Sequence, residues 1–246
     1  MLQRPWRPHR SHLEAPLPSG RITHMRKVSL VTEEYYHVFG RGVDKRQIFM
    51  DLRDYARFLQ SMEEFNTIEP IGSIYENSFR KQKHEPQLGS SASKLMKKQG
   101  KLVEFVCYCL NPNHYHFLLK QIADKGIEKF MHRLCSGFSK YFNIKHRRSG
   151  ALFQGPFKAV HVDTNEYLLY VSAYVNLNNR VHRLGSGASK SSWDEYLKGK
   201  RVKETLCDKE IILSQFKNIA EYEDFAKDGL KIMLARKDME HLLLEG

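Results

Sequence analysis

The strongest constraint on the fold of this chain is an apolar hairpin near its middle. Residues 102–110 (LVEFVCYCL) form a nearly continuous apolar run of strand length, and residues 114–120 (HYHFLLK) form a second run. Asn111-Pro112-Asn113 lies between them, and residues of these types favour a tight turn. Strands joined by so short a turn pair antiparallel. The sequence therefore predicts an antiparallel sheet built around this hairpin.

Two elements are expected before the hairpin. Residues 34–41 (EYYHVFGR) have the aromatic and β-branched content of a strand, which Gly40 and Gly42 end. Residues 51–65 place Leu52, Tyr55, Phe58, Leu59 and Met62 at helical spacing. We therefore expect a strand and then a first helix.

Three elements are expected after the hairpin. A second helix starts at Asp124 as its N-cap and keeps a 3.6-residue apolar period until Gly150. Residues 157–162 (FKAVHV) read as a strand, and a third helix, capped by Asp163 or Thr164, runs to about Asn178. The order strand, helix, strand, strand, helix, strand, helix predicts an α+β, ferredoxin-like fold with helices packed on one face of the antiparallel sheet.

The segments outside this pattern set the expected domain limits. Residues 1–26, rich in Pro and Arg, lack apolar periodicity and suggest a disordered basic arm or an over-long start before Met25. Residues 76–101 hold seven basic and two acidic side chains and predict a basic loop inserted into a domain spanning 27–182. Residues 183–246 predict a helical C-terminal region, with amphipathic stretches at 208–216 and 222–234.

The charge of the chain indicates its partner. Lys and Arg outnumber Asp and Glu by 40 to 28, yet residues 190–246 carry 11 basic and 12 acidic side chains, so the excess lies before them. A polyanion suits such a field because each phosphate neutralised by Lys or Arg releases counterions. No apolar run is long enough to span a bilayer. We expect a soluble cytoplasmic protein, associated with the nucleoid, whose partner is nucleic acid rather than a membrane.

The four cysteines are Cys107, Cys109, Cys135 and Cys207, and they form no CxxC pair. Two of them sit at strand spacing inside the first apolar run. Buried reduced thiols are therefore favoured over a zinc site.

Two histidines are candidates for a metal site. In a strand, successive side chains point to opposite faces, so His114 and His116 project together. Their ring nitrogens suit a divalent metal that needs a third oxygen or nitrogen ligand. Taken alone, the pattern equally fits two ordinary half-exposed histidines.

The third helix carries a second candidate group. Tyr167, Tyr170, Tyr174 and Asn178 follow helical spacing and share one face. The phenol of Tyr174 and the carboxamide of Asn178 can therefore point into one site. For Tyr167 and Tyr170 the preferred interpretation is packing against the sheet with the hydroxyl at the rim.

From about Tyr35 to Tyr196 the sequence resembles the single-tyrosine HUH transposases of the REP-associated, insertion-sequence type. The motifs that carry the resemblance occur in the family's order: YHVF with RGV (36–39, 41–43), YCLNPNHYHFLLK (108–120), SGALFQG with FKA (149–155, 157–159), EYLLYVSAYVNLN (166–178), and Trp193 with Tyr196. Two positions depart from the family pattern. Asn179 stands where a Pro is usual after Asn178, and Gly40 stands where an Asn is common.

The resemblance implies a role for each of these residues. The metal, Mg²⁺ or Mn²⁺, would be held by His114 and His116 with assistance from Asn178. Tyr174 would be the nucleophile that cleaves single-stranded or hairpin DNA and forms a phosphotyrosine intermediate linked to the DNA 5′ end. A protein of this type would act as a monomer or a homodimer.

A basic cluster after the hairpin is the expected DNA surface. Residues 124–161 contain eight Lys or Arg side chains against two acidic ones, with aromatic residues between them. A solvated helix face explains Lys125 and Lys129 equally well. The side chains that we expect to contact DNA are Arg41, Lys140, Lys145, Arg147, Arg148 and Lys158.

Three other functions remain compatible with the sequence. A nucleic-acid-binding protein could keep the fold and lack the chemistry. An RNA-acting nuclease could use the histidines as acid and base without a metal. A purely structural scaffold would leave the basic field unexplained.

Overall fold

The computed structural model describes residues 29–83, 100–185, 187–198 and 206–245. The predicted N-terminal arm, 1–26, lies outside these residues. At the centre is a five-stranded sheet with the order β4-β1-β3-β2-β5, in which all pairs of strands are antiparallel. The strands are β1 (Tyr35–Arg41), β2 (Val103–Asn111), β3 (His114–Gln121), β4 (Lys158–Val162) and β5 (Lys190–Ser191).

The predicted hairpin is confirmed and forms the middle of the sheet. β2 pairs with β3 from Asn111↔His114 to Val103↔Gln121, with a register shift between Phe105 and Cys107. β1 then pairs with the free side of β3, so the hairpin lies inside the sheet rather than at its edge. The order β4-β1-β3-β2, with helices after β1 and β3, is the ferredoxin-like arrangement that the sequence predicts.

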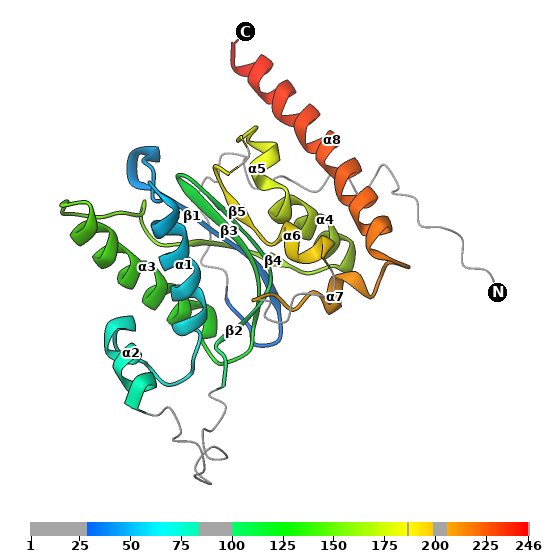
Figure 1. Cartoon of the computed structure of the whole chain (residues 1–246). Coiled ribbons are helices and arrows are strands. Elements are labelled where there is room, and N and C mark those ends of the chain that lie inside the picture. The colour runs from blue at the N-terminus through cyan, green and yellow to red at the C-terminus, as the bar shows by residue number, and fades with distance from the viewer. Residues whose placement is uncertain (1–28, 84–99, 186, 199–205, 246) are drawn as a thin grey trace.

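One face of the sheet carries the two helices that complete this unit, α1 (Leu52–Glu64) and α3 (Gly126–Lys145) (Figure 1). Asp51 caps α1 by accepting a hydrogen bond from the amide of Asp54. The second helix begins one residue later than predicted, because Lys125 has a left-handed backbone (φ 53°) and takes the N-cap position without a side-chain cap. Gly126 follows because a Cβ there would lie 2.1 Å from the carbonyl oxygen of Leu102.

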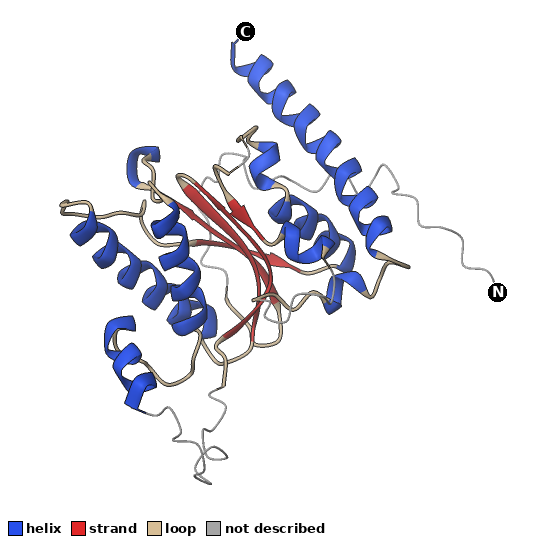
Figure 2. Cartoon of the chain, in the orientation of Figure 1, coloured by secondary structure: helices blue, strands red, loops and turns tan. Residues whose placement is uncertain are grey.

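The opposite face is covered too, which the sequence-based expectation of helices on one face missed. There α4 (Asn165–Asn176) packs on Cys107, Cys109 and Leu118 and is itself covered by α8 (Ile219–Glu245) (Figure 2). Thr164 caps α4, as predicted, by accepting from the amide of Tyr167. Every residue from 168 to 176 is buried, since the helix lies between the sheet and α8. The fold is therefore a sheet with helices on both faces.

The predicted basic loop is partly wrong, because its first eight residues belong to a helix. α2 spans Ile74–Lys83, and residues 84–99 lie outside the described residues. Ser73 and Glu76 form a capping box, in which each side chain accepts a hydrogen bond at 3.1 Å from the other's backbone amide. Ile74 packs with Phe65 and Ile71 in a small apolar cluster. These two interactions outweigh the polar composition of the segment.

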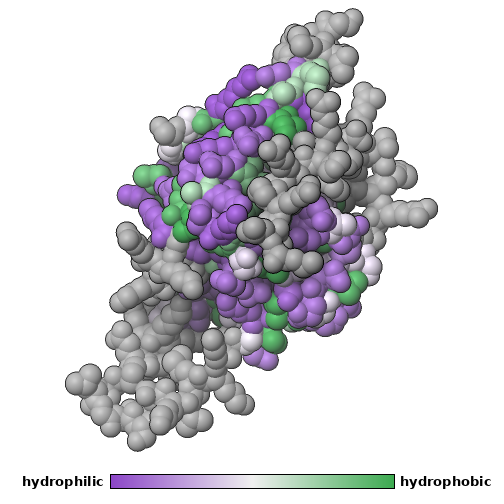
Figure 3. All heavy atoms as spheres, turned by 90° about the vertical axis from the view of Figure 1, so that its right-hand side faces the viewer, coloured by the Kyte–Doolittle hydropathy of each residue, from purple (hydrophilic) through white to green (hydrophobic). Residues whose placement is uncertain are grey.

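The C-terminal region is helical, with one short strand. It contains α6 (Trp193–Leu197), α7 (Glu210–Leu213) and α8, and it follows the short helix α5 (Asn178–Val181). Outside this region, the 3-10 turn η2 (Val43–Lys45) follows β1. The hydroxyl of Tyr196 donates to the carbonyl oxygen of Val106 at 2.8 Å, which ties α6 to β2. Mostly hydrophilic residues cover the side of the molecule where α8 lies (Figure 3). None of the helices in the described part of the chain is long and apolar enough to cross a membrane.

Candidate active site

His114 and His116 lie on the face of β3 that α4 covers. Their antiparallel partners on β1 are Arg41 and Phe39, and directly paired residues share a face of the sheet. The intervening Tyr115 is 1% exposed and points into the core of the other face. The alternation predicted for this strand is therefore confirmed. The two imidazole rings lie edge to face with their centroids 5.2 Å apart.

Asparagine side chains surround His114. Its Nδ1 lies 2.6 Å from Oδ1 of Asn113, an acceptor, so Nδ1 carries the proton and Nε2 carries the lone pair. Asn111 donates its amide to that Nε2 at 2.8 Å and also to Oδ1 of Asn178 at 2.7 Å. Two lone pairs, on His114 and Asn178, are thus aimed at one point and lie 3.2 Å apart.

His116 has a neighbour that sequence reasoning missed. The Nδ1 of His116 lies 2.9 Å from Nε2 of His37 on β1, and the two rings stack with their centroids 5.1 Å apart. His37 is fully buried, and burial lowers its pKa to about 3. Burial also lowers the pKa of His114, and it places the pKa of His116 well below the usual value. All three imidazoles are therefore neutral at pH 7.

Helix α4 places Tyr174 over these rings. The phenol ring stands edge-on to His116 at 5.6 Å and to His37 at 5.7 Å between centroids. Its side chain is buried, and burial raises the pKa of Tyr174 to about 12, an effect that the neighbouring Asn178 carboxamide opposes. The phenol and the two imidazoles therefore meet within a single chain.

Asn178 lies beyond the end of α4 rather than inside it. The helix ends at Asn176, Leu177 is its C-cap, and Asn178 is the first residue of α5. The side chain is fully buried, and its Oδ1 faces His114. Its Nδ2 has no hydrogen-bond partner among the described residues. The unpaired N–H group is therefore available to a group that enters the site.

The donors present fit a divalent cation. Neutral imidazoles and a carboxamide oxygen are ordinary ligands of Mn²⁺ and related ions, and no proton has to leave before they bind. The lone pairs of His114 Nε2 and Asn178 Oδ1 already converge on one position, which the Nδ2 group of Asn111 occupies in this structure. Among the described residues, no three His, Cys, Asp or Glu side chains form a metal group. The third protein ligand would therefore be the amide of Asn178.

The remaining sequence candidates have structural positions. The hydroxyl of Tyr170 is buried without a hydrogen-bond partner among the described residues, and Tyr167, near the start of α4, is partly buried against the apolar core on that face of the sheet. Gly40 fits its place because a Cβ there would lie 2.5 Å from the hydroxyl oxygen of Tyr115. Cys107, Cys109 and Cys207 are buried thiols outside any disulfide, as predicted, and Cys135 is half-buried.

Comparisons with known proteins agree with this geometry. Residues 72–178 match the family model described as "Transposase IS200 like". Over this segment the chain is similar to the IS200-like transposases. The matched segment runs from the start of α2 to Asn178, so it holds His114, His116 and Tyr174 but leaves out β1 with His37. The resemblance seen in the sequence is therefore confirmed.

Two further comparisons add less. No curated protein matches this sequence. A solved structure, titled "Structure of the REP associates tyrosine transposase bound to a REP hairpin", is similar with a TM-score of 0.46 and 9% identity, over 76% of this chain and 94% of that one.

The basic residues predicted to contact DNA divide into two groups in the structure. Arg41 and Lys158 are exposed and lie on the face of the sheet that carries the histidines, since they pair with His114 and Phe39. The other four lie on or just after α3, on the opposite face. The two groups are therefore separated by the sheet.

Within the second group, two side chains are engaged in the structure. Lys145 lies 2.7 Å from both Asp51 and Asp54, and Asp54 is fully buried. Arg148 donates to the side chain of Asn143 and to the carbonyl oxygen of Ala151. Lys140 and Arg147 are exposed. DNA binding by these four residues stays a prediction.

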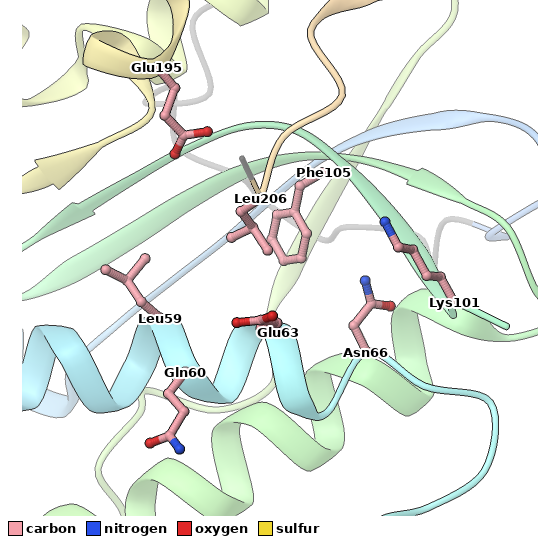
Figure 4. Close-up of a pocket in the computed structure, with 8 residues that line it drawn as sticks. All are labelled: Leu59, Gln60, Glu63, Asn66, Lys101, Phe105, Glu195 and Leu206. Carbon is pink, nitrogen blue, oxygen red and sulfur yellow. The ribbon is translucent and has the colours of Figure 1, made fainter. Parts of the chain in front are cut away.

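A cavity of about 540 Å³ lies elsewhere in the protein (Figure 4). Residues of α1, β2 and α6 line it, among them Glu63, Phe105 and Glu195. None of the candidate site residues is part of this lining. The proposed chemistry therefore does not depend on it.

Proposed function

We propose that this chain is a metal-dependent, single-tyrosine DNA transposase that cleaves and rejoins single-stranded or hairpin DNA through a phosphotyrosine intermediate. One observation supports this above the others: the phenol of Tyr174 stands 5.6 Å from the ring of His116, between centroids, in the same chain. The nucleophile and the metal ligands are therefore close enough to act on a common phosphate.

Mg²⁺ or Mn²⁺ would be held by Nε2 of His114, Nε2 of His116 and Oδ1 of Asn178. A bound cation of this kind makes a phosphate more electrophilic and stabilises the negative charge of the transition state. The buried position of these ligands strengthens the interaction, since few water molecules compete for them.

Tyr174 has to lose its proton to attack. With a pKa of about 12, the phenolate costs about 7 kcal/mol at pH 7. The unpaired Nδ2 of Asn178 supports the reaction because an N–H donor stabilises a phenolate more than a phenol. The Tyr174 oxygen then forms a bond to phosphorus while the bond to the 3′ oxygen breaks, and that oxygen takes a proton.

The product is a phosphotyrosine joined to the DNA 5′ end and a free 3′-OH. Because the new bond is a phosphodiester like the one broken, its energy is retained. A 3′-OH from another strand can attack the phosphotyrosine, release Tyr174 and rejoin the DNA without ATP. This sequence of steps is strand transfer.

The DNA strand would cross the exposed end of the catalytic face. Arg41 on β1 and Lys158 on the neighbouring β4 stand there, on the face that carries the histidine pair. Two exposed cations there suit the phosphates that flank the scissile one. The charges of these two side chains would then position the DNA backbone, with the scissile phosphate between them and Tyr174.

The burial of the histidines argues against an RNA nuclease that uses them as acid and base. Such a pair needs one imidazole that is protonated near the working pH. Burial lowers the pKa of both His114 and His116, so neither carries a proton to donate at pH 7. Neutral imidazoles are suited instead to metal ligation.

A labelled single strand carrying a hairpin tests the proposal. The protein is incubated with this DNA and Mn²⁺, and a covalent adduct is sought by denaturing electrophoresis. We expect an adduct that EDTA suppresses and that Tyr174→Phe abolishes. Tyr170→Phe, one turn earlier on the same helix, is the matched control and should retain it. A wild-type protein that binds the hairpin without forming an adduct would instead be a binding protein of the same fold.

A further inference from the structure

His37 is a buried polar residue that the proposed chemistry leaves without a role. The ring is fully buried and stacks against Phe39, with centroids 5.0 Å apart. Its Nδ1 has no hydrogen-bond partner among the described residues. An unpaired buried polar atom destabilises the fold, so an apolar side chain would pack here at lower cost. The position therefore calls for a functional explanation.

The one polar contact of His37 within the described residues is with His116. Its Nε2 lies 2.9 Å from Nδ1 of His116, which is a hydrogen-bonding distance. Each neutral imidazole carries one proton on one of its two nitrogens. A hydrogen bond between these two atoms requires one proton between them, so the contact couples the tautomers of the two rings.

Only one of the two arrangements leaves His116 able to bind a metal through Nε2. If His37 is the donor, the proton of His116 has to sit on Nε2, and that nitrogen has no lone pair to offer. If His116 is the donor, its Nδ1 carries the proton and its Nε2 presents a lone pair. No hydrogen bond within the described residues occupies this Nε2.

His114 provides a parallel within the same site. Its Nδ1 is held by Oδ1 of Asn113 at 2.6 Å, which leaves its Nε2 for ligation. Each histidine of the pair thus has its Nδ1 engaged by a neighbouring side chain. Outer partners of this kind fix the tautomer and the orientation of a metal-binding histidine.

We propose that His37 is a positioning residue that accepts the Nδ1 proton of His116 and thereby holds Nε2 of His116 as a metal-binding nitrogen. The inference rests on the proposed metal-dependent function. His37 itself touches neither the metal nor the DNA, and its burial at the contact between β1 and β3 keeps water from competing for the same proton.

Metal affinity is the first test. Mn²⁺ binding to the full-length protein is measured by the resonance signal of free Mn²⁺, without DNA. His37→Phe removes the acceptor and should weaken binding 10- to 100-fold. His37→Gln retains an acceptor oxygen and should stay within a few-fold of wild type. Phe39→Leu, which removes a ring stacked on His116 but no acceptor, is the control for lost packing. Equal affinity of wild type and His37→Phe would overturn the inference.

Nitrogen NMR of the wild-type protein is the second test, and it needs no variant. Without a metal ion, we expect the His116 ring to carry its proton on Nδ1; a proton on Nε2 would overturn the inference. If the wild type binds no metal ion, the proposed metal-dependent function fails with it. If the wild type binds metal and His37→Phe binds it equally, the function stands and the role of His37 falls.

Discussion

The carboxamide oxygen of Asn178 lies 3.2 Å from Nε2 of His114, although 64 residues separate them in the sequence. The contact joins the start of α5 to the start of β3, and it exists because α4 ends at Asn176 and the chain turns at Leu177 toward the sheet. The same Asn178 stands four residues after Tyr174. One side chain therefore links the proposed metal ligands to the proposed nucleophile.

The variant Asn178→Ala tests both proposed roles of this side chain, as a metal ligand and as a hydrogen-bond donor. We expect Mn²⁺ affinity to fall 10- to 100-fold and the cleavage rate at low Mn²⁺ to fall at least as much, because both the ligand and the unpaired N–H donor are lost. Asn179→Ala is the matched control, since its half-buried side chain has no contact with His114 or Tyr174 among those described. Titration calorimetry and single-turnover cleavage measure the two effects. Unchanged affinity in Asn178→Ala would remove Asn178 from the ligand set.

The cleavage rate should rise with pH. Because burial raises the pKa of Tyr174 to about 12, the phenolate fraction increases about tenfold per unit throughout the range below that value. Histidines with lowered pKa values stay neutral in the same range and impose no opposing loss. Single-turnover rates between pH 6.5 and 9 at saturating Mg²⁺ measure this. A plateau near pH 7 would mean that the nucleophile ionises far more easily than the structure implies.

Much of this site follows from local sequence patterns. The turn Asn111-Pro112-Asn113 fixes the hairpin, and alternation along β3 then puts His114 and His116 on one face. Helical spacing similarly places Tyr174 near Asn178. The part that could not be predicted depends on pairing between distant strands. His37 reaches His116 only because β1 adds to β3 in one particular register, which no local pattern specifies.

The sequence-based predictions that proved wrong also have physical causes. The capping box of Ser73 and Glu76 was a local signal for α2 that the basic composition of the segment masked. The second helical layer was missed because α4 is apolar on nearly all sides, which indicates burial between two layers only once α8 is known to cover it. Lys145 looked like a free cation because its partners lie about 90 residues earlier in the chain.

Acid should destabilise the metal-free protein through His37. Its pKa of about 3 in the folded state lies below the ordinary value of 6.5, so stability is complete above pH 6.5 and falls as the pH drops toward 3, because the unfolded chain binds the proton first. Between pH 7 and 5 this loss is about 2 kcal/mol. In EDTA, His37→Phe should lack that part of the pH dependence of the unfolding free energy, measured by urea denaturation. An identical slope in both proteins would contradict the burial of an uncharged ring.

Two lysines predicted as DNA contacts should behave differently. Lys145→Ala leaves the buried Asp54 carboxylate with His146 and the Met50 amide but without its lysine, and should lower the free energy of unfolding by about 1–3 kcal/mol. Lys158→Ala removes an exposed side chain from the catalytic face, so stability should hold while affinity for single-stranded DNA falls and its salt dependence becomes shallower by about one phosphate contact. Urea denaturation and DNA binding at 50 and 200 mM salt, measured on both variants, provide the comparison. If Lys145→Ala instead kept full stability and lost DNA affinity, the DNA would have to reach the α3 side of the sheet, away from Tyr174.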